Sequence, residues 1–251
     1  MTKPDLTLRD NAALFDGASD DVFTRIAARY DLLCDLFSLG IHRRWKRRMS
    51  RRICAAPWKT MLDVAAGTGH IALRVIGNLA PDEDRTCVVS DICPAMLDIA
   101  KRRAGAAASG VDFRVLDAHR LAGIESGSVD LYAISLGLKI CNRDLVLAEA
   151  WRVLRPGGLF ICLEASRIPV RMVYAAYLAY MELCMPVIGW AATGGDASAY
   201  HYLLKGVRDF PGAAELAGEI ASHGFVDVSY ERMSLGIVAI HVASKPAPSP
   251  A

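Results

Sequence analysis

Short apolar runs alternate with amphipathic stretches through most of the chain, and this alternation predicts its elements. The apolar runs have the length of buried strands, and the stretches between them repeat apolar positions every three or four residues, as helices do. We expect strands at 60–64, 87–90, 111–115, 129–135 and 159–163, and helices at 70–78, 94–104 and 144–154. Strands that alternate with helices form a parallel sheet covered on both faces.

The two ends of the chain depart from this alternation. Residues 20–37 and 41–55 predict two helices ahead of the sheet. Two strand-like runs, 226–233 and 235–244, follow each other without a helix, so we expect the sheet to finish in a hairpin. The predicted fold class is therefore α/β: a seven-stranded, mostly parallel sheet whose last strand is an antiparallel edge, with helices on both faces.

One domain over residues 20–245 accounts for this pattern, since 251 residues suffice for a single large core. Residues 167–212 lie between the fifth strand and the last helix, and we expect this insertion to cap a pocket. The polar segment 1–19 and the proline-rich tail 246–251 are predicted to be disordered.

The composition excludes several classes of protein. Although 53% of the residues are hydrophobic, no run of 18 lacks a charge; residues 170–193 come nearest and contain Arg171, Glu182 and Pro186. We read that segment as a buried or ligand-facing helix. The first ten residues lack the apolar core of a signal peptide, so a cytoplasmic protein is expected. The seven cysteines form no Cys-x-x-Cys pair and the six histidines no paired spacing, so no metal site is expected.

Positive charge is concentrated in one predicted helix. Seven of the ten residues 43–52 are Lys or Arg, while Ile41, Trp45, Met49 and Ile53 recur every four residues. One interpretation is an apolar stripe that docks on the core beneath a solvated basic face. Another is attraction to anionic lipid headgroups, which would place the protein peripherally on the inner face of the membrane. Nucleic acid is disfavoured because the net charge is only +2 and no aromatic residues are interleaved.

The most informative stretch runs from Asp63 to Gly69, where an acid lies four residues ahead of a Gly-x-Gly turn. The turn follows a predicted strand and opens a predicted helix, an arrangement that brings backbone N–H groups close to a ligand. The glycine pattern alone is weak. A carboxylate at the strand end, however, suits a ligand that carries a cation better than it suits a pyrophosphate. S-adenosylmethionine carries both an ammonium group and a sulfonium, and a nicotinamide cofactor is disfavoured.

A second acid supports a nucleoside ligand. Asp91 ends the next predicted strand, a little over 20 residues after the glycine turn, where a carboxylate can bind both ribose hydroxyls. Each acid alone could instead cap a helix or solvate a loop. Together with the glycines between them, they predict a nucleoside site.

Four blocks in this order make the chain resemble the ubiquinone/menaquinone biosynthesis C-methyltransferase family over residues 15–245. The first runs from Phe23 to Trp45 and includes Tyr30-Asp31, with Cys34 where the family usually has Asn. The other three are residues 152–160, residues 195–203 followed by Phe210-Pro211, and residues 235–241. The resemblance implies the class I methyltransferase fold, which is Rossmann-like, and S-adenosyl-L-methionine as cofactor, with S-adenosyl-L-homocysteine as product.

The resemblance places cofactor contacts at Thr68, Asp91, Asp117, Ala118 and Ser135. Met96 is a further candidate, either covering the adenine ring or packing in the core. The full predicted cofactor-binding set is Asp63, Ala65, Gly67, Thr68, Gly69, Asp91, Ile92, Met96, Asp117, Ala118 and Ser135.

Carbon methylation of a hydroxy-aromatic ring requires a base, or a cation that stabilises the phenolate. Lys139 stands where the family usually has Arg, and it either fills this role or only extends from a loop. The other catalytic candidates are Tyr30, Asp196 and His201, of which His201 is as readily a surface histidine. The tyrosines at 174, 177 and 180 predict an apolar stripe that either cradles an isoprenoid tail or packs on the sheet.

The predicted function is C-methylation of a polyprenylated quinol precursor, of the demethylmenaquinol or ubiquinol-pathway type. Lys139 and Cys34 motivate an alternative, a methyltransferase of the same family acting on another lipophilic acceptor such as a terpenoid, a lipid amine or a secondary metabolite. A non-catalytic, cofactor-binding subunit of a quinone-biosynthesis complex is a third reading. The expected partners are a lipophilic small molecule and an anionic membrane surface, with a homodimer left open.

Overall fold

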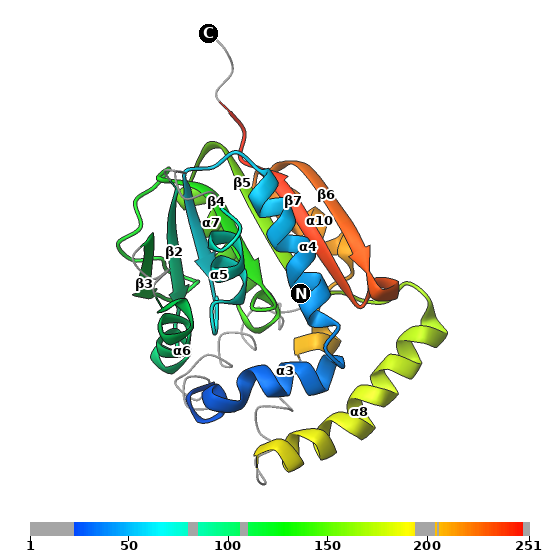
Figure 1. The fold of residues 1–251 in the computed structure, drawn as a ribbon. Helices are drawn as coiled ribbons and strands as arrows, with labels where there is room; N and C mark the ends of the chain where they lie inside the picture. Colours follow the sequence, from blue (N-terminus) through cyan, green and yellow to red (C-terminus); the bar gives the residue numbers. More distant parts are fainter. Residues whose placement is uncertain (1–22, 80–84, 106–109, 194–203, 205, 248–251) are drawn as a thin grey trace, which may run out of the picture.

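One seven-stranded sheet organises the chain (Figure 1), and the computed structural model describes residues 23–79, 85–105, 110–193, 204 and 206–247. The strand order is β3-β2-β1-β4-β5-β7-β6. The strands are β1 (Thr60–Val64), β2 (Thr86–Asp91), β3 (Val111–Val115), β4 (Val129–Ser135), β5 (Leu154–Ala165), β6 (Val226–Met233) and β7 (Val238–Ser244). The predicted α/β fold is therefore confirmed.

The hairpin at the end of the chain differs from the prediction in its placement. β7 is antiparallel to both β5 and β6 and lies between them, so the antiparallel strand is internal and β6 forms the edge. The predicted antiparallel edge is wrong. β7 pairs with β5 along seven consecutive residues, from Leu159↔Ser244 to Ala165↔Val238, and both its faces are largely buried. An apolar strand of this kind is better placed inside a sheet than at its edge.

Helices cover both faces of the sheet, as Figure 1 shows. One face packs against α4 (His42–Ala55), α5 (His70–Ile76) and α6 (Pro94–Ala104), and the other against α7 (Arg143–Val153) and α10 (Ala213–Ser222). The side chains of β1 follow the period of two of a strand: Leu62 and Val64 face α7 and α10, whereas Met61 faces α4 and α5.

Two more helices lie outside these layers and contact each other: α3 (Tyr30–Ser38), which follows a 3₁₀ turn at Ala27–Arg29, and α8 (Arg171–Thr193). Between them Phe37 of α3 packs with Tyr177, Tyr180 and Met181 of α8. Tyr177 and Tyr180 thus pack against helix α3 and not on the sheet, which was the second of the two predicted roles. Shorter 3₁₀ turns lie at Leu138–Ile140 and Ser234–Gly236.

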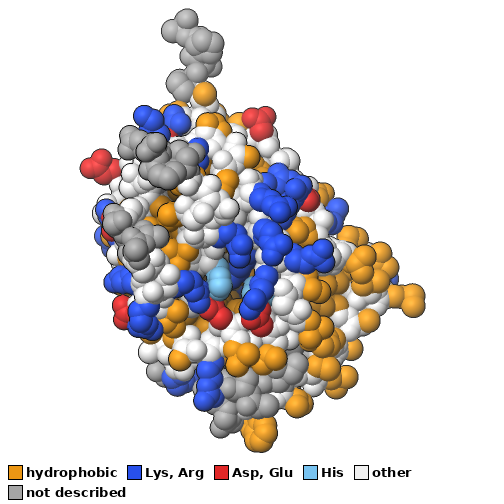
Figure 2. Space-filling model, in the orientation of Figure 1, with side chains coloured by type: hydrophobic (Ala, Val, Ile, Leu, Met, Phe, Trp, Pro, Cys, Tyr) orange, Lys and Arg blue, Asp and Glu red, His pale blue; other side chains and the backbone are white. Residues whose placement is uncertain are grey.

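The basic helix α4 is amphipathic, as predicted. Trp45, Met49 and Ile53 are buried against the sheet. Its basic side chains gather on one face of the molecule (Figure 2). Some of them form ion pairs. Arg48 contacts Glu231 at 3.2 Å, and Arg52 contacts the same carboxylate. In the described residues no helix is both long enough and apolar enough to span a bilayer.

Candidate functional site

A pocket of about 710 Å³, counting the part open to solvent, lies beside the ends of β1, β2 and β4. The strand order reverses between β1 and β4, and open α/β sheets bind ligands outside the strand ends at such a point. Many predicted site residues line it: Tyr30, Ala65, Gly67, Asp91, Ile92, Met96, Asp117, Ala118 and Ser135. Their contact with a cofactor stays a prediction, but the fold brings them to one place from distant parts of the chain.

Asp91 ends β2 and fixes the shape of the glycine turn. Its carboxylate accepts the N–H of Gly67 at 2.7 Å and the N–H of Cys93 at 2.9 Å. Gly67 has a φ of 57°, in the left-handed region that favours glycine. Asp91 also lines the pocket, where a carboxylate can accept from ligand hydroxyls.

The turns after β1 and β4 touch each other at the pocket wall. Ala65 and Leu136 both have left-handed backbones, with φ of 49° and 59°. A Cβ on Gly137 would lie 2.7 Å from the Cβ of Ala65, so only glycine fits where the two turns meet. Left-handed conformations of non-glycine residues cost on the order of 1–3 kcal/mol and concentrate at ligand sites.

Asp63 lies behind the glycine turn and does not line this pocket, so its contact with a ligand stays a prediction. It is fully buried, its carboxylate accepts the N–H of Ala72 at 3.1 Å, and burial raises its pKa to about 7. It therefore anchors the first turn of α5. Gly69 lies outside the pocket lining as well: a Cβ there would be 2.9 Å from that of Ala100, so this glycine allows α5 to approach α6.

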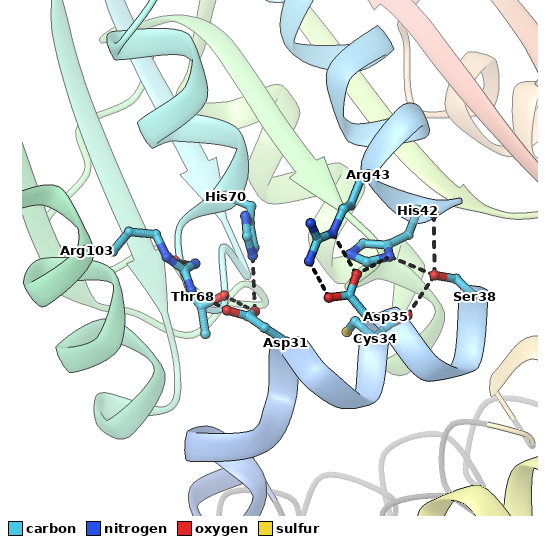
Figure 3. Close-up of polar contacts among 9 residues, drawn as sticks. All are labelled: Asp31, Cys34, Asp35, Ser38, His42, Arg43, Thr68, His70 and Arg103. Atoms are coloured by element: carbon cyan, nitrogen blue, oxygen red, sulfur yellow. Dashed lines mark hydrogen bonds and ion pairs between the residues drawn. The ribbon is translucent and has the colours of Figure 1, made fainter. Parts of the chain in front are cut away.

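Thr68, the third predicted contact outside the pocket lining, joins the turn to α3 (Figure 3). Its hydroxyl donates to Asp31 at 2.8 Å, and the same carboxylate contacts His70 at 3.1 Å and pairs with Arg103. Burial raises the pKa of Asp31, but hydrogen bonds from His70, Thr68 and Arg103 outweigh it and hold the pKa well below its usual range. Asp31 thus fastens α3 across the glycine turn, next to Tyr30 of the pocket.

A second cluster joins α3 to α4 in the same view (Figure 3). His42 is 4% exposed, and its Nδ1 lies 2.7 Å from the hydroxyl of Ser38. Ser38 donates to the carbonyl of Cys34, so Nδ1–H of a neutral His42 is the donor to Ser38. Burial, reinforced by Lys46, lowers the pKa of His42 to about 4.

This buried histidine makes stability depend on pH. Because its folded pKa of about 4 lies below the unfolded value of about 6.5, the unfolded chain binds the proton more readily. The contribution of His42 is present above pH 6.5 and is lost as pH falls toward 4. We expect the free energy of unfolding to fall by about 2 kcal/mol between pH 7 and 5, less so in His42→Gln. Urea unfolding at both pH values measures this, and an equal decrease in the variant would contradict it.

His119, which sequence analysis missed, connects Asp117 to Asn142 at the start of α7. The N–H of Asn142 donates to its Nε2 at 2.9 Å, so its Nδ1 is protonated and donates to Asp117 at 2.7 Å. The sequence held a weak signal, a histidine two residues after a strand-end acid. The other missed lining residues are Phe23, Leu116, Leu136, Gly137, Ile140 and Cys141.

Lys139, the predicted phenolate partner, lies next to the pocket in a buried ion pair. Its Nζ is 3.2 Å from Glu164 of β5 and also donates to the carbonyl of Leu136. The side chains of Lys139 and Glu164 are 5% and 0% exposed. Glu164 further accepts the backbone N–H groups of Lys139 at 3.0 Å and Ala165 at 2.7 Å. The cation is therefore already balanced by a carboxylate, an arrangement the sequence analysis did not anticipate.

Two catalytic candidates, Asp196 and His201, lie outside the described residues. Within the described ranges, no group of three or more His, Cys, Asp or Glu side chains could hold a metal ion. The buried hydroxyl of Ser135 lines the pocket and has no hydrogen-bond partner there. A buried polar atom without a partner costs free energy, so it marks a place where a polar ligand atom fits.

Comparison with known proteins identifies close relatives. A model of the ubiE/COQ5 methyltransferase family matches residues 12–245. The Acidiphilium cryptum protein named ubiquinone/menaquinone biosynthesis C-methyltransferase UbiE is 41% identical over 224 residues, which are 88% of each chain. A mitochondrial 2-methoxy-6-polyprenyl-1,4-benzoquinol methylase of Oryza sativa is 36% identical over 246 residues, covering 90% of this chain and 82% of the rice protein.

Solved structures show the same fold at low sequence identity. An S-adenosylmethionine-dependent methyltransferase of Thermotoga maritima superposes with a TM-score of 0.62 at 18% identity, over 90% of this chain and 98% of the other. This similarity supports the fold alone.

Proposed function

Because the chain belongs to the ubiE/COQ5 methyltransferase family, as its sequence resemblance predicted, we propose that it methylates a ring carbon of a polyprenylated quinol precursor. Methyltransferase activity follows from the family itself. The acceptor, of the demethylmenaquinol or ubiquinol-pathway type, is inferred from the names of the bacterial and plant relatives. Since such an acceptor resides in a bilayer, we place the enzyme in the cytoplasm and at the inner membrane surface.

The single observation that carries the proposal is the pocket where the strand order reverses, with Asp91 and Asp117 on its wall. The residues present fit S-adenosylmethionine. The Asp91 carboxylate on the pocket wall can accept from ribose hydroxyls, and that of Asp117 can accept from the adenine amino group. The Ser135 hydroxyl has no hydrogen-bond partner among the described residues. When bound, this cofactor supplies an electrophilic methyl group and leaves as S-adenosylhomocysteine, and the ring carbon that takes the methyl group gives up a proton.

The protein's own contribution is to position the reactants, exclude water and control protons. Tyr30 lines the pocket, and its Cys34 neighbour together with burial raises its pKa well above the usual value. Its hydroxyl therefore stays protonated and can donate a hydrogen bond to the acceptor oxygen. The ammonium of Lys139, together with Asp196 and His201, remains among our proposed catalytic groups.

Label transfer tests the proposal. The purified protein is incubated with methyl-labelled S-adenosylmethionine and membranes from a bacterium that lacks quinone C-methylation. We expect the label in the extracted quinone, on a ring carbon, and none when excess S-adenosylhomocysteine competes. Label in a different lipid would overturn the acceptor, and cofactor binding without any labelled lipid would overturn the proposed enzyme activity.

A further inference from the structure

Helix α8 exposes an apolar stripe along its whole length. Residues 172, 176, 179, 183, 187 and 190 recur every three or four positions and are all apolar, so they share one side of the helix. The large side chains among them are strongly exposed: Met172 84%, Leu183 72%, Val187 65% and Trp190 62%. At about 1.5 Å per residue the stripe is roughly 27 Å long. An exposed apolar face of this extent marks a contact site.

Helix α3, which packs against α8, continues this apolar surface. Leu32 and Leu36 of α3 are four residues apart and exposed, and Leu39, directly after the last residue of the helix, is 75% exposed. Phe37, Tyr177 and Met181 pack together between the two helices. The outward residues of both helices are therefore not needed for packing between the two helices. Figure 2 shows the hydrophobic side chains over α8 beside the basic side chains over α4.

Three arginines of α4 remain unpaired next to this surface. Arg44, Arg47 and Arg51 are exposed, lie on one side of the helix, and make no ion pair or hydrogen bond in the described part of the chain. The acids of α3 and α8 are already engaged: Asp31 with Arg103, Asp35 with Arg43, and Glu182 with Arg208. The surface thus combines apolar side chains with uncompensated positive charge.

We propose that the outward stripes of α8 and α3 dock on a lipid bilayer, with Arg44, Arg47 and Arg51 on its anionic headgroups. A bilayer supplies both an apolar interior and negative charge at its surface. A second copy of this chain, meeting face to face, would set arginines against arginines, and the acids of α3 and α8 are already paired. The inference rests on the proposed function, because it gives the pocket, which Tyr30 of α3 lines, access to an acceptor held in the membrane.

Vesicle cosedimentation tests this docking without cofactor or acceptor, so its failure is distinct from a failure of the methyl-transfer assay. Wild-type protein should bind phosphatidylcholine vesicles that contain phosphatidylglycerol, and bind them less as salt rises. Leu183→Ser/Val187→Ser should lower the partition coefficient at least tenfold. The matched control Val115→Ser/Leu145→Ser changes residues that are exposed elsewhere, and it should bind like wild type.

Charge-removing variants measure how much the arginines of α4 contribute to vesicle binding, separately from the apolar stripe. Each basic residue near an anionic surface strengthens binding roughly fivefold, so Arg47→Gln/Arg51→Gln should weaken it roughly 30-fold. Arg102→Gln/Arg120→Gln makes the same charge change elsewhere and should leave binding unaltered. Brominated lipid should quench the fluorescence of Trp190, and Trp190→Phe should remove that quenching.

Three results would overturn the proposal: no vesicle binding by the wild-type protein, equal binding by Leu183→Ser/Val187→Ser, or no quenching that depends on Trp190. A concentration-dependent dimer that Leu183→Ser/Val187→Ser dissociates would also overturn it and would assign the face to a second copy of the chain.

Discussion

Replacing Asp91 with alanine should weaken the binding of S-adenosylhomocysteine by about 10²- to 10⁴-fold. In our proposal this carboxylate accepts both ribose hydroxyls, and each hydrogen bond to a charged group is worth about 1.5–3 kcal/mol. The same side chain holds the N–H groups of Gly67 and Cys93, so its loss also loosens the turn that forms the pocket wall. Titration calorimetry at equal salt measures the two affinities.

Asp98→Ala is the matched control, because it removes one exposed carboxylate from α6 without touching the pocket. Its affinity should stay within twofold of wild type. Asp91→Asn keeps one acceptor oxygen, so its affinity for S-adenosylhomocysteine should lie between those of Asp91→Ala and the wild-type protein. If Asp91→Ala binds within threefold of wild type while its circular dichroism is unchanged, Asp91 does not hold the ribose.

Lys139→Met should lower the free energy of unfolding by about 3–5 kcal/mol, because it leaves Glu164 charged and buried without its partner. The double variant Lys139→Met/Glu164→Gln removes both charges, and its amide oxygen keeps an acceptor for one of the two backbone N–H groups that Glu164 holds, those of residue 139 and Ala165. It should recover part of this loss. Chemical denaturation of the three proteins at pH 7 gives the comparison, and a double variant as unstable as the single one would contradict the importance of the pair.

The double variant also isolates the proposed chemistry of Lys139 from its effect on folding. If its ammonium stabilises the phenolate, the refolded double variant should still turn over about 10²- to 10³-fold more slowly than wild type. Turnover within tenfold of wild type would instead leave Lys139 a purely structural role. Cofactor affinity should stay the same in either case, because Asp91 and Asp117 are untouched.

Local sequence patterns were enough to predict where the strands lie and which residues form most of the pocket wall. β1, β3, β4 and β6 have the predicted bounds because short apolar runs between polar turns are a local property. Asp91 and Ser135 end β2 and β4, and Asp117 follows the end of β3 by two residues, so their positions in the sequence placed all three at one edge of the sheet. The internal position of β7 could not be predicted this way, because pairing between distant strands depends on which partner buries it better.

Side-chain directions at the site were harder to predict. Asp63 belongs to the side of β1 that faces α4 and α5, and the period of two in a strand does not say which side faces the ligand. The pairing of Lys139 with Glu164 joins the 3₁₀ turn after β4 to β5, so no local pattern in the sequence predicts it. One clue was present, since a carboxylate inside the apolar run 159–165 is almost never buried unless it is paired.

The bonds that fasten α3 to the glycine turn bear on the timing of the catalytic cycle. Asp31, the residue after Tyr30, bonds to Thr68, His70 and Arg103. A nucleoside that leaves the pocket on this side must first break these bonds, so that α3 separates from the glycine turn. In many enzymes that enclose their ligands, an opening step or product release is slower than the chemical step. In that regime the residence time of the spent cofactor, and hence the turnover number, is governed by a carboxylate that does not line the pocket.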